Sequence, residues 1–169
     1  ARRMTIYLHS ADDTRKPGNL NDPPDDAEEL AERDLNPPCV LVFNARGEVF
    51  LQKRSMKKDR EPGKWDSSTS GHVDSGETYD ACAVRELQEE IGWKPSTPLQ
   101  RLFKLPASEQ TDQEHVWTYR CNGEGPFTLQ PEELDDGRWF DLKAVDDWIH
   151  RKPDDFAPAF LAIWPRFRQ

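Results

Sequence analysis

Residues 71–93 read GHVDSGETYDACAVRELQEEIGW, a glycine-containing loop followed by an acidic amphipathic segment. On a helix that turns by about 100° per residue, Glu86, Glu89 and Glu90 share one face, because positions i, i+3 and i+4 are neighbours. Clustered carboxylates repel one another, so this face needs solvent or a cation to offset its charge. A hard divalent ion such as Mg²⁺ prefers oxygen ligands of this kind. Two interpretations follow, a solvated helix face and a metal site.

The same stretch carries the start and stop signals of a helix. Thr78 suits the N-cap, and Gly92 suits the position just after the last turn, so the helix is predicted to run to Ile91. Val84 and Leu87 form an apolar stripe with Ile91, away from the carboxylates, and this stripe can pack into a core.

The stretch also matches a known signature at every fixed position, G-x5-E-x7-R-E-U-x-E-E-x-G-U, in which U is a bulky apolar residue. The matching positions are Gly71, Glu77, Arg85, Glu86, Leu87, Glu89, Glu90, Gly92 and Trp93. Trp93 is an unusual but apolar choice for the last of them. The chain therefore resembles the Nudix hydrolases. The resemblance implies a Nudix-type α/β/α sandwich around a mixed β-sheet and hydrolysis of a diphosphate linked to another moiety.

The resemblance implies roles for the acidic residues. Glu86, Glu89 and Glu90 would hold Mg²⁺, with Mn²⁺ as an alternative, and the Gly71 carbonyl would be a further ligand. The metal would neutralise the diphosphate oxygens and polarise phosphorus for attack by water. Either Glu86 or Glu89 would act as the general base, and the sequence leaves this choice open.

Arg85 and Glu77 complete the expected catalytic machinery. We expect them to form an ion pair that holds the loop against the helix and orients the carboxylates, which is a positioning role.

The segment before the signature, residues 51–77, resembles the Nudix subgroup that is similar to isopentenyl-diphosphate isomerase. In those isomerases a catalytic cysteine lies just before the glycine-histidine pair, and here that place is Ser70. His72 matches one of their metal-binding histidines, but the upstream segment offers only His9. These departures favour hydrolysis. An isomerase of this kind and a non-catalytic Nudix binding module remain the alternatives.

Several candidate substrate contacts lie outside the signature. Lys53, Arg54, Lys57, Lys58 and Arg60 form a basic cluster in an otherwise acidic chain. Arg54 and Lys58 are our candidates for phosphate contacts at the mouth of the site, and a solvated loop is the alternative.

Three further polar residues are candidates by position. His72 is a candidate substrate contact. Glu114 stands near where the isomerases carry a second catalytic carboxylate, and an exposed acid at a strand end is the alternative. Glu133, which follows Glu132, resembles the place where many Nudix enzymes supply one more acidic metal ligand from outside the signature.

The hydrophobic pattern predicts a mixed α/β domain over residues 37–169. Strands are expected at 39–43, 48–54, 65–70, 99–105, 115–121 and 137–140, and helices at 142–150 and 158–167. Residues 1–36 are polar and rich in Asp and Pro, which predicts an irregular arm with a short strand at 5–8 and a short helix at 25–33. A lid over the site is the alternative role for that arm.

Composition narrows the partners. The 169 residues carry a net charge of −9, which argues against a nucleic-acid partner. Three cysteines without metal-ligand spacing predict reduced thiols in a cytoplasmic protein. No apolar run reaches the length of a membrane span or a signal segment, so we expect no membrane partner. The sequence indicates a small diphosphate as substrate but does not identify it, and it leaves open whether the protein forms a homodimer.

Overall fold

Strand β1 (Pro38–Phe43) lies near the centre of a mixed seven-stranded sheet in the computed structural model, which describes residues 37–169. The expected strand at 5–8 and helix at 25–33 lie outside these residues. β1 runs parallel to β6 (Val116–Asn122), which is antiparallel to β5 (Gln100–Leu105). On its other side β1 is antiparallel to β4 (Thr69–Ser70) at its start and to β2 (Val49–Arg54) at its end. β2 also pairs with β3 (Trp65–Asp66) and β7 (Leu134–Phe140).

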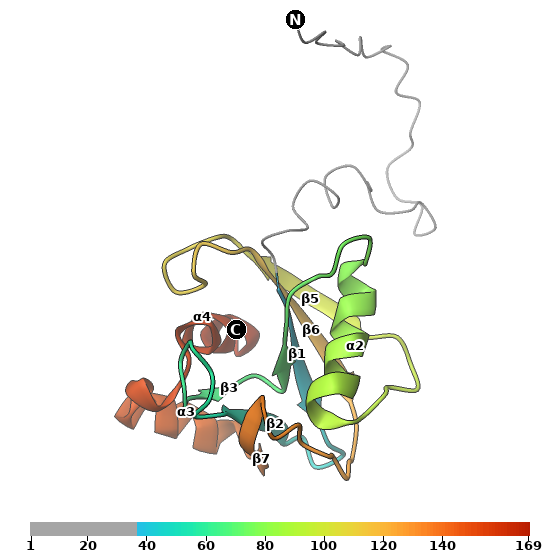
Figure 1. Ribbon diagram of the computed structural model, residues 1–169. Helices are drawn as coiled ribbons and strands as arrows, with labels where there is room; N and C mark the ends of the chain where they lie inside the picture. The colour runs from blue at the N-terminus through green and yellow to red at the C-terminus, as the bar shows by residue number, and fades with distance from the viewer. Residues whose placement is uncertain (1–36) are drawn as a thin grey trace, which may run out of the picture.

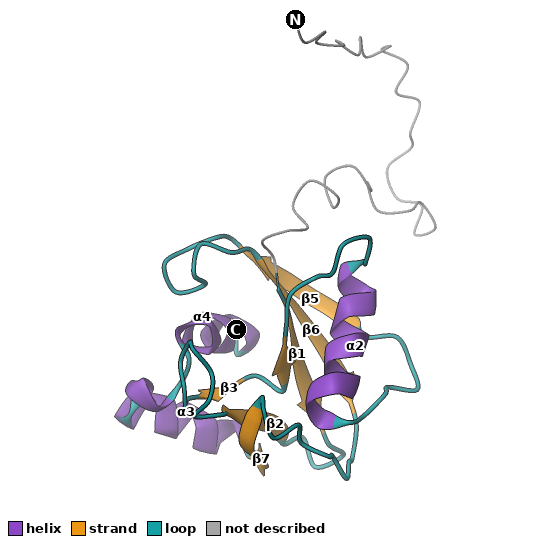
Figure 2. Cartoon of the chain, in the orientation of Figure 1, coloured by secondary structure: helices purple, strands orange, loops and turns teal. Residues whose placement is uncertain are grey.

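Helices cover both faces of this sheet (Figures 1 and 2). Helix α2 (Tyr79–Ile91) packs on one face, and α3 (Leu142–Arg151) and α4 (Pro158–Phe167) pack on the other. The alternation of β1 divides the core in two, because successive side chains of a strand point to opposite faces. Val40 and Val42 face α2, whereas Cys39, Leu41 and Phe43 face α3 and α4. The predicted α/β/α sandwich is confirmed.

Helix α2 begins and ends at the predicted caps. The Thr78 hydroxyl accepts a hydrogen bond from the Ala81 N–H at 3.2 Å. Gly92 adopts a left-handed conformation with φ 62°, which a residue with a Cβ adopts only at a cost, and its N–H donates to Gln88 O at 3.1 Å. Leu87 and Ile91 are fully buried as expected, while Val84 is only half-buried.

The single strand expected over residues 65–70 is a wrong prediction, since β3 and β4 are separated at Ser67 and Ser68. The Ser68 hydroxyl explains the break. It accepts from the Val42 N–H at 2.8 Å and donates to Phe50 O at 2.5 Å, so it bridges β1 and β2. The Ser68 hydroxyl thus takes the place of a direct backbone hydrogen bond between β1 and β2.

Residues 65–70 also connect the two helical layers. The Ala157 N–H, just before α4, donates to Trp65 O at 2.9 Å, and Phe156 forms an isolated bridge with Trp65. At the other end of the segment, the Ser70 N–H donates to the Glu90 carboxylate of α2 at 3.2 Å. A short stretch of chain therefore fixes α4 and α2 to the same part of the sheet.

The other expected elements are present with small differences at their ends. β7 is three residues longer than predicted at its start, and a 3-10 turn, η1 (Pro153–Asp155), joins α3 to α4. All three cysteines are buried free thiols. Among the helices of residues 37–169, none is both long and apolar enough to cross a membrane.

Candidate active site

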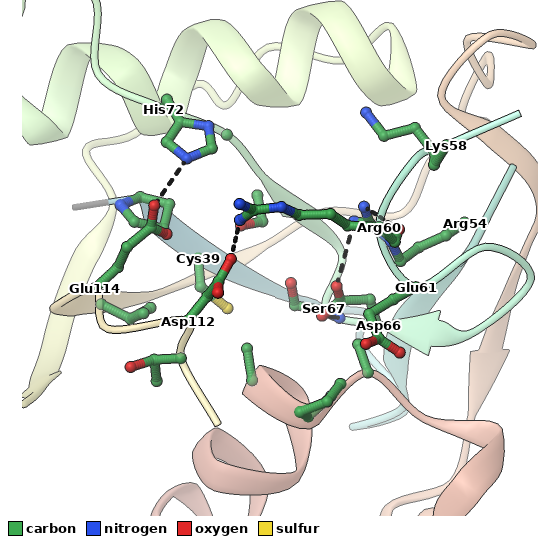
Figure 3. A pocket seen from close by; sticks show the side chains of 18 of the residues that line it. Cys39, Arg54, Lys58, Arg60, Glu61, Asp66, Ser67, His72, Asp112 and Glu114 are labelled. Carbon is green, nitrogen blue, oxygen red and sulfur yellow. Dashed lines mark hydrogen bonds and ion pairs between the residues drawn. The ribbon is translucent and has the colours of Figure 1, made fainter. Parts of the chain in front are cut away.

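A cavity of about 920 Å³ opens where the parallel strands β1 and β6 begin, between α2 and the start of α4 (Figure 3). It lies within the size range of ligand sites in proteins, about 300–1,000 Å³. The predicted metal ligands and substrate contacts come from five separate segments of the chain, and all of them line this cavity: Arg54, Lys58, Gly71, His72, Glu86, Glu89, Glu90, Glu114 and Glu133. Glu77 and Arg85 do not line it.

Glu86 lies directly beneath Gly71. A Cβ atom added to Gly71 would stand 2.0 Å from the Glu86 carboxyl carbon and from its Oε1, so only glycine allows this carboxylate its place. Glu86 is 8% exposed. Burial raises the pKa of its carboxyl, and the Arg85 guanidinium opposes that rise. The glycine at the start of the signature thus provides space for a buried acid.

Glu90 is the most deeply placed acid of the site. Burial, followed by the neighbouring Glu86 carboxylate, raises the pKa of Glu90 well above its usual range. The Ser70 N–H is its hydrogen-bond donor. Two buried carboxyl groups with raised pKa values create a strongly negative potential, which a cation would relieve.

Arg85 connects the glycine loop to the acidic helix. Its Nε and Nη2 donate to the two oxygens of Glu77, each at 3.0 Å, and its Nη2 also donates to His72 O at 2.8 Å. The bidentate pair lowers the pKa of Glu77 and raises that of Arg85. The ion pair expected from the sequence is therefore present.

The same guanidinium also occupies part of the acidic face. Arg85 Nη1 donates to Glu86 at 2.7 Å and to Glu89 at 3.0 Å. The Glu89 side chain is 58% exposed, so the three carboxylates differ in environment although they share a helix face.

The metal site that these acids suggest is supported by their donor chemistry. Carboxylates and a backbone carbonyl are the ligands that Mg²⁺ and Mn²⁺ favour, and the Gly71 cradle and the buried pair Glu86 and Glu90 fit such an ion. Within residues 37–169, no three His, Cys, Asp or Glu side chains are gathered closely enough to hold a metal as they stand. Glu89 is engaged with Arg85 instead, so metal binding would require Glu89 to turn away from it.

The basic residues at the cavity mouth each contact an acid. Lys58 pairs with Glu133, and Arg54 lies 3.6 Å from Asp66 and donates to the Arg60 carbonyl at 3.0 Å. Arg60 pairs with Asp112 from the loop between β5 and β6. Figure 3 shows Arg54, Lys58 and Arg60 around the opening, with Asp66 and Asp112 close to the two arginines. An anionic substrate that contacts Arg54 or Lys58 would have to share them with these carboxylates.

His72 and Glu114 lie together on the far side of the opening (Figure 3). His72 Nε2 is 3.2 Å from the Glu114 carboxylate. The His72 side chain is mostly exposed, whereas that of Glu114 is largely covered. Both remain candidate substrate contacts.

Sequence reasoning missed several residues that line the cavity. Asp66 is a buried acid in β3, and burial raises the pKa of its carboxyl. Asp112 lies in the loop between β5 and β6, and the start of α4 was predicted only as part of a helix. The only indication in the sequence was Asp66, because a charged residue within the strand expected at 65–70 can mark a functional position.

Comparisons with known proteins agree with the signature. A family model described as the NUDIX domain matches residues 34–160. An uncharacterised Nudix hydrolase of Yersinia pestis is 33% identical over 74% of this chain and 68% of its own length. An isopentenyl-diphosphate Delta-isomerase of Serratia proteamaculans is 32% identical over 73% of this chain and 71% of its own. A prenyl-diphosphate phosphatase of Methanosarcina mazei is 31% identical over 71% of each chain.

A solved structure supports the fold. The protein DR0079 of Deinococcus radiodurans superposes with a TM-score of 0.63 at 22% identity, over 69% of this chain and 73% of that one. At this identity the similarity extends to the fold alone.

Proposed function

The chain belongs to the Nudix family, whose members act on diphosphate-containing substrates and generally use a divalent metal, and on that premise we propose a specific reaction. The protein is a Mg²⁺-dependent hydrolase that cleaves a diphosphate linkage in a nucleoside diphosphate derivative or a related small molecule. Water attacks one phosphorus of the P–O–P linkage, the bridging oxygen leaves with the other phosphorus, and each of the two products carries a phosphate group. The observation that carries this proposal is the meeting of the signature carboxylates and the basic residues Arg54 and Lys58 in one cavity.

The charge of that cavity supports the need for a divalent metal. Ten carboxylates line it against three Arg and Lys side chains. A diphosphate adds further negative charge, which like charges at short range would repel. Mg²⁺, with Mn²⁺ as the alternative, would supply charge neutralisation and polarisation of the phosphoryl group.

The acids of the α2 wall would hold the metal. Glu86, Glu89 and Glu90 provide carboxylates and Gly71 its carbonyl oxygen, and Glu133 is a further ligand from outside the signature. Glu86 or Glu89 takes the proton of the attacking water. Of these two, the exposed Glu89 has room to change its orientation once it leaves Arg85, whereas Glu86 is held between Gly71 and Arg85.

The remaining residues bind and orient. Arg54 and Lys58 contact the diphosphate oxygens, since both already exchange contacts with carboxylates at the cavity mouth. His72 and Glu114 contact the substrate on the opposite side. Arg85 and Glu77 position the carboxylates from behind.

Two alternative functions are less well supported. The resemblance to the isomerases implies a catalytic cysteine just before the glycine-histidine pair, but Ser70 stands at that place. A binding module without catalysis would have no need of three acids and a bidentate arginine that orients them.

We also propose that residues 37–169, which follow the polar residues 1–36 in the sequence, form the catalytic domain, that the protein acts in the cytoplasm, and that it has no nucleic-acid or membrane partner. The net charge of −9 and the three free thiols support this setting. Sedimentation of the protein would show whether it forms a homodimer.

A substrate panel tests the proposed reaction. Nucleoside diphosphate derivatives, dinucleoside polyphosphates and prenyl diphosphates are each incubated with Mg²⁺, and phosphate-containing products are measured. We expect turnover that stops in chelator, and a loss of about a hundredfold or more in Glu89→Gln, which replaces an anionic group by a neutral one of equal size. Full activity in chelator, or near-normal turnover of a folded Glu89→Gln, would contradict the metal-dependent mechanism.

A further inference from the structure

The two walls of the cavity differ in chemistry. The wall on α2 carries Glu86, Glu89 and Glu90. The opposite side, at the start of α4 and of the strands β1 and β6, carries a group of apolar residues, and the buried Asp66 lies beside them. We call this group the apolar wall, and it consists of Cys39, Val116, Ala157, Pro158, Ala159 and Ile163.

The apolar wall is continuous with the interior of the protein. Cys39, Val116, Ala157 and Ile163 belong to the core between the sheet and the helices α3 and α4. Each of these four is at most 3% exposed, so they form the floor of the cavity rather than its rim. A hydrocarbon placed against them would leave water for an apolar surface, which is favourable in proportion to its area.

The same wall is poorly suited to a nucleobase. No Phe, Tyr or Trp is among the described residues that line the cavity, so a base would find no large aromatic ring on which to stack. The edge of a base also carries donors and acceptors, and leaving these unpaired in an apolar environment is costly. The six residues of the apolar wall have no strongly polar side chain that could pair with these donors and acceptors.

We propose that the apolar wall binds the hydrocarbon part of an alkyl diphosphate whose diphosphate group lies against α2. This inference rests on the proposed function and narrows its substrate to the diphosphate ester of an aliphatic alcohol. The carboxylate wall and the basic mouth take the charged end, and the α4 side of the cavity selects the other end by its size and its lack of polarity.

Ala159 is the specificity-determining residue of this subsite. It lies in the first turn of α4, half-buried, and its side chain is only a methyl group. Pro158 beside it has no side-chain or backbone donor. A larger residue at position 159 would occupy space that the far end of an alkyl chain needs.

The test measures binding of non-hydrolysable alkyl methylenebisphosphonates to the wild-type protein by calorimetry with Mg²⁺ present. The compounds share one head group and differ in chain length. Each added methylene that reaches the apolar wall should tighten binding about fourfold, the factor that burial of one CH₂ gives. Binding that does not change with chain length, or an adenosine analogue that binds more tightly than every alkyl compound, would overturn the proposal.

A second series replaces the end methyl group by a carboxylate. The affinity that the longer chain adds should then be lost, because the carboxylate would be buried against apolar side chains. The backbone N–H groups at the start of α4 have no side-chain cap, so an anion is the rival occupant of this wall. Tighter binding of the carboxylate compounds would assign the wall to that anion and reject the hydrocarbon.

Two matched variants locate the effect. Ala159→Phe should weaken binding of the longer chains about tenfold, as overfilling a packed site does, and leave the chain-free methylenebisphosphonate within about twofold. Ala144→Phe places the same side chain on the exposed face of α3, away from the cavity, and should change neither. If Ala159→Phe does not fold, the chain-length series on the wild type still decides the question.

The panel of hydrolysis assays separates this inference from the proposed function. Turnover of nucleotide derivatives without chain-dependent alkyl binding would reject the inference and retain the hydrolase. Chain-dependent binding without hydrolysis of any diphosphate would retain the alkyl-binding wall and reject the hydrolase. Absence of both would reject both.

Discussion

Replacing Gly71 by alanine tests whether the position of the Glu86 carboxylate matters for catalysis. The new Cβ would stand 2.0 Å from the carboxyl carbon and Oε1 of Glu86, and 2.4 Å from Oε2. Real contacts to a Cβ do not fall below 3.0 Å, so the carboxylate would have to retreat by about 1 Å. Misplacement of a catalytic group by about 1 Å can cost a factor of about 100 in rate.

The fold should survive this change. The group that must move is the end of a flexible side chain, and Gly71 does not have a positive φ that would strain an alanine. We therefore expect Gly71→Ala to lower kcat about a hundredfold, measured as initial rates of phosphate release with Mg²⁺, while the Tm changes little.

Gly47→Ala is the matched control. Gly47 lies in the turn between β1 and β2 with φ +77°, and nothing lies within 4 Å of an added Cβ. Alanine there should cost about 1–2 kcal/mol of stability through backbone strain and leave kcat unchanged. A folded Gly71→Ala that keeps activity within twofold of the wild type would refute the reasoning, because Glu86 would then not need its place beneath Gly71.

Three further outcomes are expected. A double-mutant cycle of Glu77→Gln and Arg85→Lys should show coupling of about 1–3 kcal/mol in unfolding free energy, and additive effects would mean that the bidentate pair contributes nothing. Ser70→Ala should keep most of the hydrolytic activity and Ser70→Cys should not produce an efficient isomerase, since the carboxylates that activate water are complete; a phosphoserine trapped at this position would contradict that. Because burial raises the pKa of Glu90, its ionised form opposes folding above that pKa, and this destabilisation disappears as pH falls through it. Glu90→Gln should therefore raise the Tm in chelator at pH 7 but not at about pH 4, and it should lower activity about a hundredfold or more. Calorimetry in chelator at both pH values measures the Tm, and an unchanged Tm at pH 7 would count against a buried charge on Glu90.

Features that depend on neighbouring residues were predictable from the sequence. The caps Thr78 and Gly92, the apolar stripe through Leu87 and Ile91, and the pair formed by Arg85 and Glu77 all lie within one short stretch. Local propensity and helical spacing are sufficient to place such groups.

Features that depend on distant segments were not predictable. The break between β3 and β4 arises because the Ser68 hydroxyl reaches the backbones of two other strands. The pairing of Arg60 with Asp112 joins loops 52 positions apart in the chain. Ala159 appears in the sequence as one more apolar residue of an amphipathic helix, and only the packing of α4 against the sheet places it at a cavity.

The segment of residues 65–70 acts as a spacer of fixed length between the two ends of the cavity. At one end Trp65 O holds the chain just before α4, and at the other the Ser70 N–H holds Glu90. An extended chain advances about 3.3 Å per residue, so one residue inserted or deleted between these anchors would change their separation by up to about that amount. Such a change would alter the distance between the carboxylates of α2 and the start of α4, and with it the room between the reacting phosphorus and the far end of the substrate. Length variation in this stretch is therefore a route by which evolution, or an engineer, could fit the same chemistry to a longer or shorter molecule.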